Sequence, residues 1–219
     1  LTGVFRSDDN GCSWSATSPT LRSPFVDVVA VSPAFATDET VVAGTMDSGL
    51  HISYDGGGSW RRRDFWGKHP TITALSFSPN YADDGTIAAG AEGGGVYVTE
   101  NWGDSWNGYG PELADADITA LAVASHEADV LLAGSTEGGL MRSTTKARSW
   151  SVSSGVPVAA TVSALAVSPT FDGDGHALAG TEAHGVFCSA NHGETWHVVD
   201  GIPSGKPVNG LTYINGSTV

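Results

Sequence analysis

The chain has 219 residues, with 24 Asp or Glu against 10 Lys or Arg and a formal net charge of −14. This charge excludes nucleic acid as an expected partner, because a phosphate backbone attracts a basic surface. No apolar run approaches the length of a membrane span. Charged residues make up 16% of the chain and Gly occurs 29 times, which favours short strands joined by Gly turns over a charged helical bundle.

The strongest signal is an internal repeat. A Ser-Trp or Thr-Trp pair recurs at intervals of 46, 46, 44 and 46 residues, at Trp14, Trp60, Trp106, Trp150 and Trp196. An Ala-Gly pair follows the same period, at Gly44, Gly90, Gly134 and Gly180. A Ser-Pro pair marks a third phase, with Ser125-His126 as its one departure. Four-stranded units with a period of about 40 to 50 residues are typical of propeller blades.

The repeat predicts the elements in chain order. Residues 1–19 supply outer strands of a shared blade, and four further blades occupy residues 20–64, 65–110, 111–155 and 156–202. In the last of these, short apolar or alternating runs predict strands at 162–167, 176–181, 185–189 and 195–199. The first strand of each copy is the most apolar and is expected to be buried on both faces. Residues 203–219 are expected to return to the shared blade.

We therefore predict a single all-β domain over residues 1–219. It is a five-bladed β-propeller of four-stranded antiparallel blades, in which strands from both termini close one blade. Closure removes exposed sheet edges, which is a physical reason for the two ends to share a blade. A piece of a longer propeller is the alternative.

The turn before each repeating Trp resembles the Asp-box, or BNR, repeat, whose pattern is Ser-x-Asp-x-Gly-x-Ser/Thr-Trp. The copies at 7–14 and 53–60 match in full, and those at 99–106 and 189–196 carry Asn in place of Asp. The copy at 143–150 has lost both the Asp and the Gly. The resemblance covers nearly the whole chain. It implies a β-propeller from a superfamily that includes sialidases, xyloglucanases, sortilin-type receptors and a photosystem II assembly factor.

The Asp-box residues are expected to build the fold and not to perform chemistry. An Asp or Asn side chain in such a turn accepts hydrogen bonds from turn amides, Gly adopts a positive φ, and Trp covers the hairpin. Three of the five copies lack the carboxylate, which argues against a catalytic role. We therefore assign a structural role to Asp9, Trp14, Asp55, Trp60, Asn101, Trp106, Trp150, Asn191 and Trp196.

Candidate binding residues lie on the crossover face, where the blade-to-blade crossovers meet the connections between the second and third strands. An acid follows each Ala-Gly pair on this face, at Asp47, Glu92, Glu137 and Glu182. These are either ordinary solvated loop acids or a carboxylate ring that binds a cation, a sugar or a basic partner. No His or Cys spacing and no complete calcium loop predicts a metal site, and no motif predicts a cofactor.

The crossover after Trp60 combines cationic and aromatic residues, among them Arg62, Trp66 and His69. It is either an outer strand followed by a Trp that fills the blade interface, or a recognition patch for a sugar or an acidic peptide. The next crossover carries a Tyr and three acids, which are expected to neighbour this patch: Tyr109, Glu112, Asp115 and Asp117.

We interpret the chain as a non-catalytic binding or scaffold propeller that recognises a glycan or protein partner through its crossover face. The repeat accounts for most of the sequence, and no catalytic constellation is left over. The alternative is a glycoside hydrolase-like BNR-repeat enzyme that uses paired carboxylates such as Glu92, Glu137 and Asp117. The sequence leaves the ligand and the oligomeric state open, and the resemblance favours a secreted or cell-envelope location.

Overall fold

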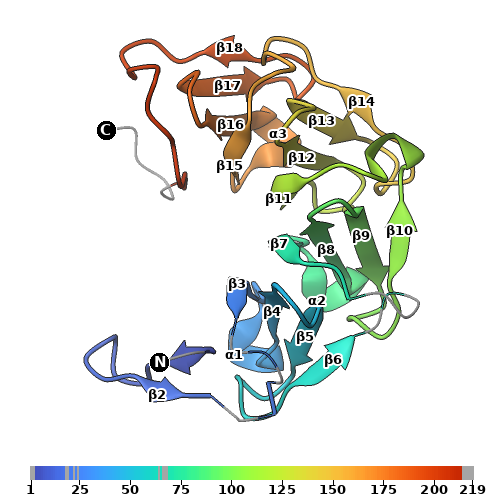
Figure 1. Ribbon diagram of the computed structural model, residues 1–219, viewed down its shortest axis with the longest axis vertical. Helices are drawn as coiled ribbons and strands as arrows, with labels where there is room; N and C mark the ends of the chain where they lie inside the picture. The colour runs from blue at the N-terminus through green and yellow to red at the C-terminus, as the bar shows by residue number, and fades with distance from the viewer. Residues whose placement is uncertain are drawn as a thin grey trace.

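The computed structural model describes residues 3–17, 20, 21, 23, 25–63, 65 and 69–213. Its strands form four four-stranded antiparallel sheets and one two-stranded hairpin, and each four-stranded sheet consists of consecutive strands. These sheets follow one another along a curve whose open side lies between the N-terminal hairpin and the last described residues (Figure 1). Within the described ranges, no helix is long and apolar enough to cross a membrane.

We number the four-stranded sheets as the first to fourth blade. The first blade contains β3 (Val26–Val31), β4 (Val41–Thr45), β5 (Leu50–Ser53) and β6 (Arg61–Arg63). The second contains β7 (Ile72–Phe77), β8 (Thr86–Ala91), β9 (Gly95–Glu100) and β10 (Asn107–Tyr109). The third contains β11 (Ile118–Val123), β12 (Leu131–Ser135), β13 (Leu140–Ser143) and β14 (Ser151–Val152). The fourth contains β15 (Val162–Val167), β16 (His176–Thr181), β17 (Val186–Ala190) and β18 (His197–Val198). The N-terminal hairpin contains β1 (Phe5–Arg6) and β2 (Ser15–Ala16).

The innermost strands β3, β7, β11 and β15 lie beside one another on the inner side of the curve (Figure 1). The expectation that these strands are the ones buried on both faces is wrong. The second strands β4, β8 and β12 are buried along their whole length, whereas β3 alternates between half-buried and exposed residues. The reason is that one side of an innermost strand faces the centre of the curve. A second strand, in contrast, pairs with strands of its own blade along both edges, and its two faces pack against neighbouring blades.

The repeating Ala-Gly pair has a packing explanation. A Cβ on Gly90 would collide with the side chain of Ile118, the first residue of the next blade's innermost strand. Gly134 meets Val162 in the same way, because a Cβ there would lie 2.6 Å from the Cβ of Val162. A side chain at this position would therefore push neighbouring blades apart, and the glycine sets how closely they approach.

The Ser-Pro segments contain single helical turns that the strand pattern does not predict. They are α1 (Phe35–Asp38), α2 (Tyr81–Asp84) and α3 (Phe171–Asp174), and a further 3-10 turn, η1, spans Pro111–Leu113. In α2, the Ser78 hydroxyl donates to Asp84 Oδ2 at 2.5 Å, and Thr86 N donates to Asp84 Oδ1 at 2.7 Å. The Asp therefore ties the turn to the beginning of the next strand.

The predicted fifth blade is only partly represented. β1 and β2 pair with each other, as its two outer strands should. Residues 208–213 do not form a strand, but Val208 N donates to Thr181 O at 3.1 Å. The rest of the prediction involves residues 1, 2 and 214–219, which lie outside the described residues, so ring closure remains a prediction.

Candidate functional site

The connections between strands divide between two opposite faces of the molecule. One is the hairpin face, which carries the helical turns and the Asp-box hairpins, joined by bonds such as Trp102 N to Gly85 O at 2.9 Å. The other is the crossover face, where the second-to-third strand loops bond to the crossovers, as in Glu92 N to Thr71 O at 3.0 Å. The side chains of the Asp-box and of the loop acids therefore lie at opposite ends of the strands.

The five Asp-box turns share one hydrogen-bond arrangement despite their different sequences. In a full copy, Asp55 Oδ1 accepts from Ser59 N and Asp55 Oδ2 accepts from the Ser59 hydroxyl, both at 2.7 Å. In an Asn copy, Asn101 Oδ1 accepts from Ser105 N at 3.0 Å, while its Nδ2 donates to the Ser105 hydroxyl at 2.9 Å. Even Thr145 accepts from Ser149 N at 2.9 Å. The position needs a hydrogen-bond acceptor and does not need a charge.

These bonds also set the acidity of the Asp-box carboxyls. Hydrogen bonds from the Ser13 side chain and backbone and from Ser7 lower the pKa of Asp9 to about 2. The equivalent bonds from Ser59 and Ser53 lower the pKa of Asp55. A carboxyl that is held ionised can accept hydrogen bonds but is a poor general acid, so both residues suit the structural role.

The repeating Trp side chains differ in burial. Trp60, Trp106, Trp150 and Trp196 are buried between blades, whereas Trp14 in the N-terminal hairpin is 64% exposed. The Trp14 ring still donates to Gly11 O of its own turn at 3.2 Å. Trp14 is therefore seated on its hairpin as expected, but no blade covers it among the described residues.

The loop acids Asp47, Glu92, Glu137 and Glu182 lie on four separate loops between second and third strands, one in each blade. Asp47 accepts a hydrogen bond from the buried Ser23 hydroxyl and is thus tied to its own blade. Glu92 and Glu182 are exposed on separate loops. Glu137 is the exception, because it shares a depression with acids from the preceding crossover.

This acidic depression is the most chemically distinctive hollow of the crossover face. It has a volume of about 520 Å³ and lies where the β10–β11 crossover meets the β12–β13 loop. Four carboxylates line it, from Glu112, Asp115, Asp117 and Glu137. Asp117 is fixed by Gly93 N, which donates to its Oδ1 at 2.6 Å. The sequence placed three of these acids on one crossover, and it grouped Glu137 with Asp117 only as a possible carboxylate pair of the hydrolase alternative.

A second hollow, the tyrosine depression, lies on the other side of the same crossover segment. It has a volume of about 410 Å³ and is lined by Tyr97, Tyr109, Pro111 and small residues. The Arg148 guanidinium lies 5.8 Å from the centre of the Tyr109 ring, where it can interact with the aromatic face. Burial raises the pKa of the Tyr97 hydroxyl above its ordinary value of 10.0.

In the crossover after Trp60, residues 61–63 form the outer strand β6, as one of the two expectations had it. Trp66 lies outside the described residues. Phe65 is fully buried with its ring 4.4 Å from Tyr97 and 5.6 Å from Trp106, so it fills the blade interface. Arg62 is exposed on β6, and His69 is exposed beside Gly49, in the loop that carries Asp47.

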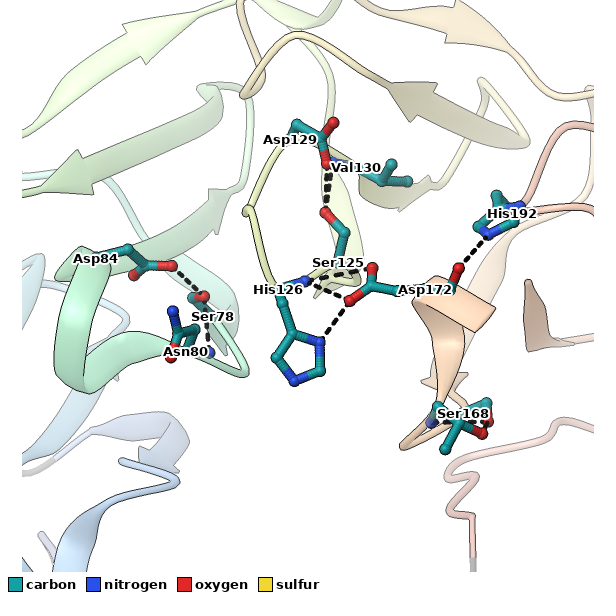
Figure 2. A network of polar contacts seen from close by, with 11 residues as sticks. Ser78, Asn80, Asp84, Ser125, His126, Asp129, Val130, Ser168, Asp172 and His192 are labelled. Atoms are coloured by element: carbon teal, nitrogen blue, oxygen red, sulfur yellow. Dashed lines mark hydrogen bonds and ion pairs between the residues drawn. The ribbon is translucent and has the colours of Figure 1, made fainter. Parts of the chain in front are cut away.

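The hairpin face holds a polar contact between blades that sequence reasoning missed. His126 Nδ1 lies 2.5 Å from Asp172 Oδ2, and His126 N donates to the same carboxylate at 3.1 Å. Figure 2 shows Asp172 extending from α3 of the fourth blade to His126 in the β11–β12 connection of the third. The signal was the departure from Ser-Pro at Ser125-His126. The described residues contain no group of three or more His, Cys, Asp or Glu that could hold a metal ion.

Comparison with known proteins finds solved structures with a similar fold. No protein-family model and no curated protein matches the chain. Among similar solved structures, an ancestral GH74 enzyme has a TM-score of 0.75 and 23% identity, covering 94% of this chain and 29% of that chain. The GH74 xyloglucanase from Xanthomonas campestris has a TM-score of 0.70 and 18% identity, covering 92% and 35%. YCF48 bound to D1 peptide has a TM-score of 0.58 and 16% identity, covering 83% and 54%.

In each case the chain spans less than two thirds of the length of the protein that it resembles. At these identities the likeness concerns the backbone and not the site residues. The neighbours include both enzymes and a peptide-bound protein, so they do not select one activity. The Cps50 (Swd1) β-propeller domain from Myceliophteria thermophila is also similar, with a TM-score of 0.63 and 18% identity, covering 87% of this chain and 59% of that chain, and this likeness identifies the fold as that of a β-propeller.

Proposed function

We propose that the chain is a non-catalytic binding or scaffold propeller whose ligand, a glycan or a protein, docks on the crossover face. The observation that carries this proposal is the pair of depressions on either side of residues 110–117. One offers tyrosine rings and the other carboxylates, so a ligand lying across them would meet apolar and polar groups together. Loops held by a rigid repeat scaffold are where such sites usually occur.

The carboxyls whose pKa values are lowered do not belong to the depressions of the crossover face. Asp9, Asp55 and Asp174 have clearly lowered pKa values, and all three lie on the hairpin face. A glycosidase requires instead a carboxylic acid that stays protonated to donate to the leaving group. The lowered carboxyls therefore serve the turns.

A glycoside hydrolase-like activity is the second candidate. Asp117 and Glu137 line one depression and could act as a carboxylate pair. Two of the similar structures are GH74 enzymes, one of them a xyloglucanase. The peptide-bound YCF48 structure favours the binding alternative in the same way.

We also propose that residues 203–219 and 1–19 form the fifth blade of one domain. Ser163 Oγ donates to Val208 O at 2.7 Å, just as Thr119 Oγ1 donates to Val162 O at 2.6 Å one blade earlier. Gly180 meets Val208 as Gly134 meets Val162. Residue 208 therefore has the contacts of a residue that begins the next innermost strand.

The fourth blade also leaves space at Gly201 where the outer part of the fifth blade could pack. Gly155 has a φ of 99°, and a Cβ there would collide with the backbone of Trp196. Gly201, one repeat later, has a φ of 82° and nothing within 4 Å of its Cβ position. In a closed ring this glycine would receive Trp14.

A combined binding and turnover assay tests the proposed function. Glycan and peptide arrays probed with the full chain should give binding that falls in Glu137→Gln and not in Glu182→Gln. The second variant is a matched control, because it removes the equivalent loop acid of the next blade. Xyloglucan oligomers and aryl glycosides should remain uncleaved. Turnover that disappears in Asp117→Asn would establish the hydrolase instead.

A further inference from the structure

The acidic depression has an apolar floor in addition to its acids. Leu113 and Met141 are buried beneath it, while Val152 and Val158 remain 56% and 57% exposed at its wall. Large aliphatic side chains with this much exposure, gathered in one hollow, are typical of surfaces that bind another molecule. Met in such a surface adapts to ligands of different shapes.

All the charged side chains that line the acidic depression are negative. Its described lining contains Glu112, Asp115, Asp117 and Glu137 and no Lys or Arg. The whole chain carries a net charge of −14, so the long-range field favours a cationic ligand as well. Close placement of like charges is relieved when a cation binds among them.

The combination of aliphatic floor and carboxylate rim matches one kind of side chain. Lys and Arg have an apolar stem and a cationic head, so the stem can contact Val152 and Val158 while the head reaches the acids. No aromatic ring lines this depression in the described structure, so it lacks the flat apolar surface that a sugar ring could stack on. The tyrosine depression, beyond residues 110–117, offers room for an apolar side chain of the same ligand.

We propose that the acidic depression binds an extended cationic segment of a partner protein. Lys or Arg side chains of that segment lie over Val152 and Val158 and pair with Glu112 and Glu137, and an adjacent apolar residue enters the tyrosine depression. Asp117 is a positioning residue, because its carboxylate holds the β8–β9 loop through Gly93 N. This inference rests on the proposed function, since it names the class of ligand for the same face.

The test is fluorescence anisotropy with the full chain and a labelled peptide of sequence Gly-Arg-Val-Lys-Val-Arg-Gly. A Glu-for-Lys/Arg peptide and a Ser-for-Val peptide are the ligand controls. We expect the first peptide to bind best and to weaken about threefold to tenfold in Glu112→Gln/Glu137→Gln, since exposed ion pairs contribute modestly. Affinity should also fall as salt rises, and Val158→Ser should weaken binding while charge is unchanged.

Glu92→Gln/Glu182→Gln is the matched control, because it removes the same charge from exposed loops outside the depression. Equal weakening in both double variants would mean general charge attraction and would overturn the proposed site. Glycan-array binding without peptide binding would overturn this inference and leave the proposed function standing. No binding to either class of ligand would overturn both.

Discussion

At the scale of single residues, glycines recur at equivalent positions of the blades for one of two physical reasons, either lack of space or a positive φ. Gly90 adopts an ordinary backbone conformation, yet the Cβ of any other residue would overlap Ile118. Its requirement is therefore space and not a positive φ. The Asp-box glycines have the other requirement, because Gly57 has a φ of 94° and Gly103 one of 88°. Ala147 occupies this position at a φ of 65°, so one blade accepts a strained residue in its turn.

Gly90→Ala should lower the free energy of unfolding by about 1–3 kcal/mol, because an added methyl group has no room between the second and third blades. Gly173→Ala is the control, since nothing lies within 4 Å of its Cβ position and it sits in α3. It should change stability by less than about 1 kcal/mol. Urea denaturation measures both variants, and equal effects would contradict the packing explanation.

The Asp-box carboxyls predict a pH dependence. The folded pKa of Asp9 lies near 2, below its ordinary value of 3.8, and that of Asp55 is also lowered. Their stabilisation is therefore present above about pH 4 and is lost as the pH falls towards the folded values. Asp9→Asn/Asp55→Asn should lose less stability between about pH 4 and about pH 2.5 than the unmodified chain. Urea unfolding midpoints measured across this pH range give the change in stability. If the midpoints of the variant and of the unmodified chain fell equally with pH, the lowered pKa values of Asp9 and Asp55 would be refuted.

At the scale of elements, the four-strand repeat follows from the sequence because its markers have physical causes. The Ala-Gly pair spaces the blades, and the Trp fills the gap between them. The one-turn helices could not be predicted, because four residues are too few to show a helical period. The burial of the first strands was predicted wrongly for a different reason. A run such as 162–167 is apolar except at Ser163, and only the assembled curve decides which side of the strand faces its centre.

The candidate site was predictable only in part for a related reason. The sequence identified Glu137 and the acids near Tyr109 separately, as residues of two loops. Their meeting in one depression depends on how the third blade's loop folds back beside the crossover that precedes it. The expectation that Tyr109 neighbours the crossover after Trp60 involves residues 66–68, which lie outside the described residues, so it stays a prediction.

Trp106 and Trp102 give a matched test of the blade interface. Trp106 is 4% exposed between the first and second blades, whereas Trp102 is 47% exposed on the hairpin face. Trp106→Ala should reduce the free energy of unfolding by about 3–5 kcal/mol, as for other large core truncations. Trp102→Ala should cost about 1 kcal/mol. Thermal and urea unfolding measure the stability of both variants. A larger loss of stability in Trp102→Ala than in Trp106→Ala would contradict the placement of Trp106 in the blade interface.

At the scale of the whole molecule, ring closure can be tested with the two natural cysteines. Both are free, with Cys12 exposed and Cys188 half-buried. Cys188 occupies the repeat position of Arg142, whose Nε donates to His192 O in the turn of the following blade at 2.7 Å. In a closed ring Cys188 would therefore face the turn that contains Cys12. A short bismaleimide should join them within one chain, which peptide mass spectrometry would detect.

Cys12→Ser is the control for this crosslink and should abolish it. If both thiols react with single-ended reagents yet no intramolecular product forms, the two ends of the curve stay apart. That result would refute the shared fifth blade while leaving the four complete blades unaffected.

The central claim is that the crossover face binds a partner without changing it chemically. The most direct measurement is calorimetric titration of the tightest array ligand, followed by mass spectrometry of that ligand after prolonged incubation with the chain. The account predicts one ligand bound per chain, weaker binding in Glu112→Gln/Glu137→Gln, and an unchanged ligand mass. A cleaved ligand, protected from cleavage when Asp117→Asn or Glu137→Gln replaces the unmodified chain, would contradict it.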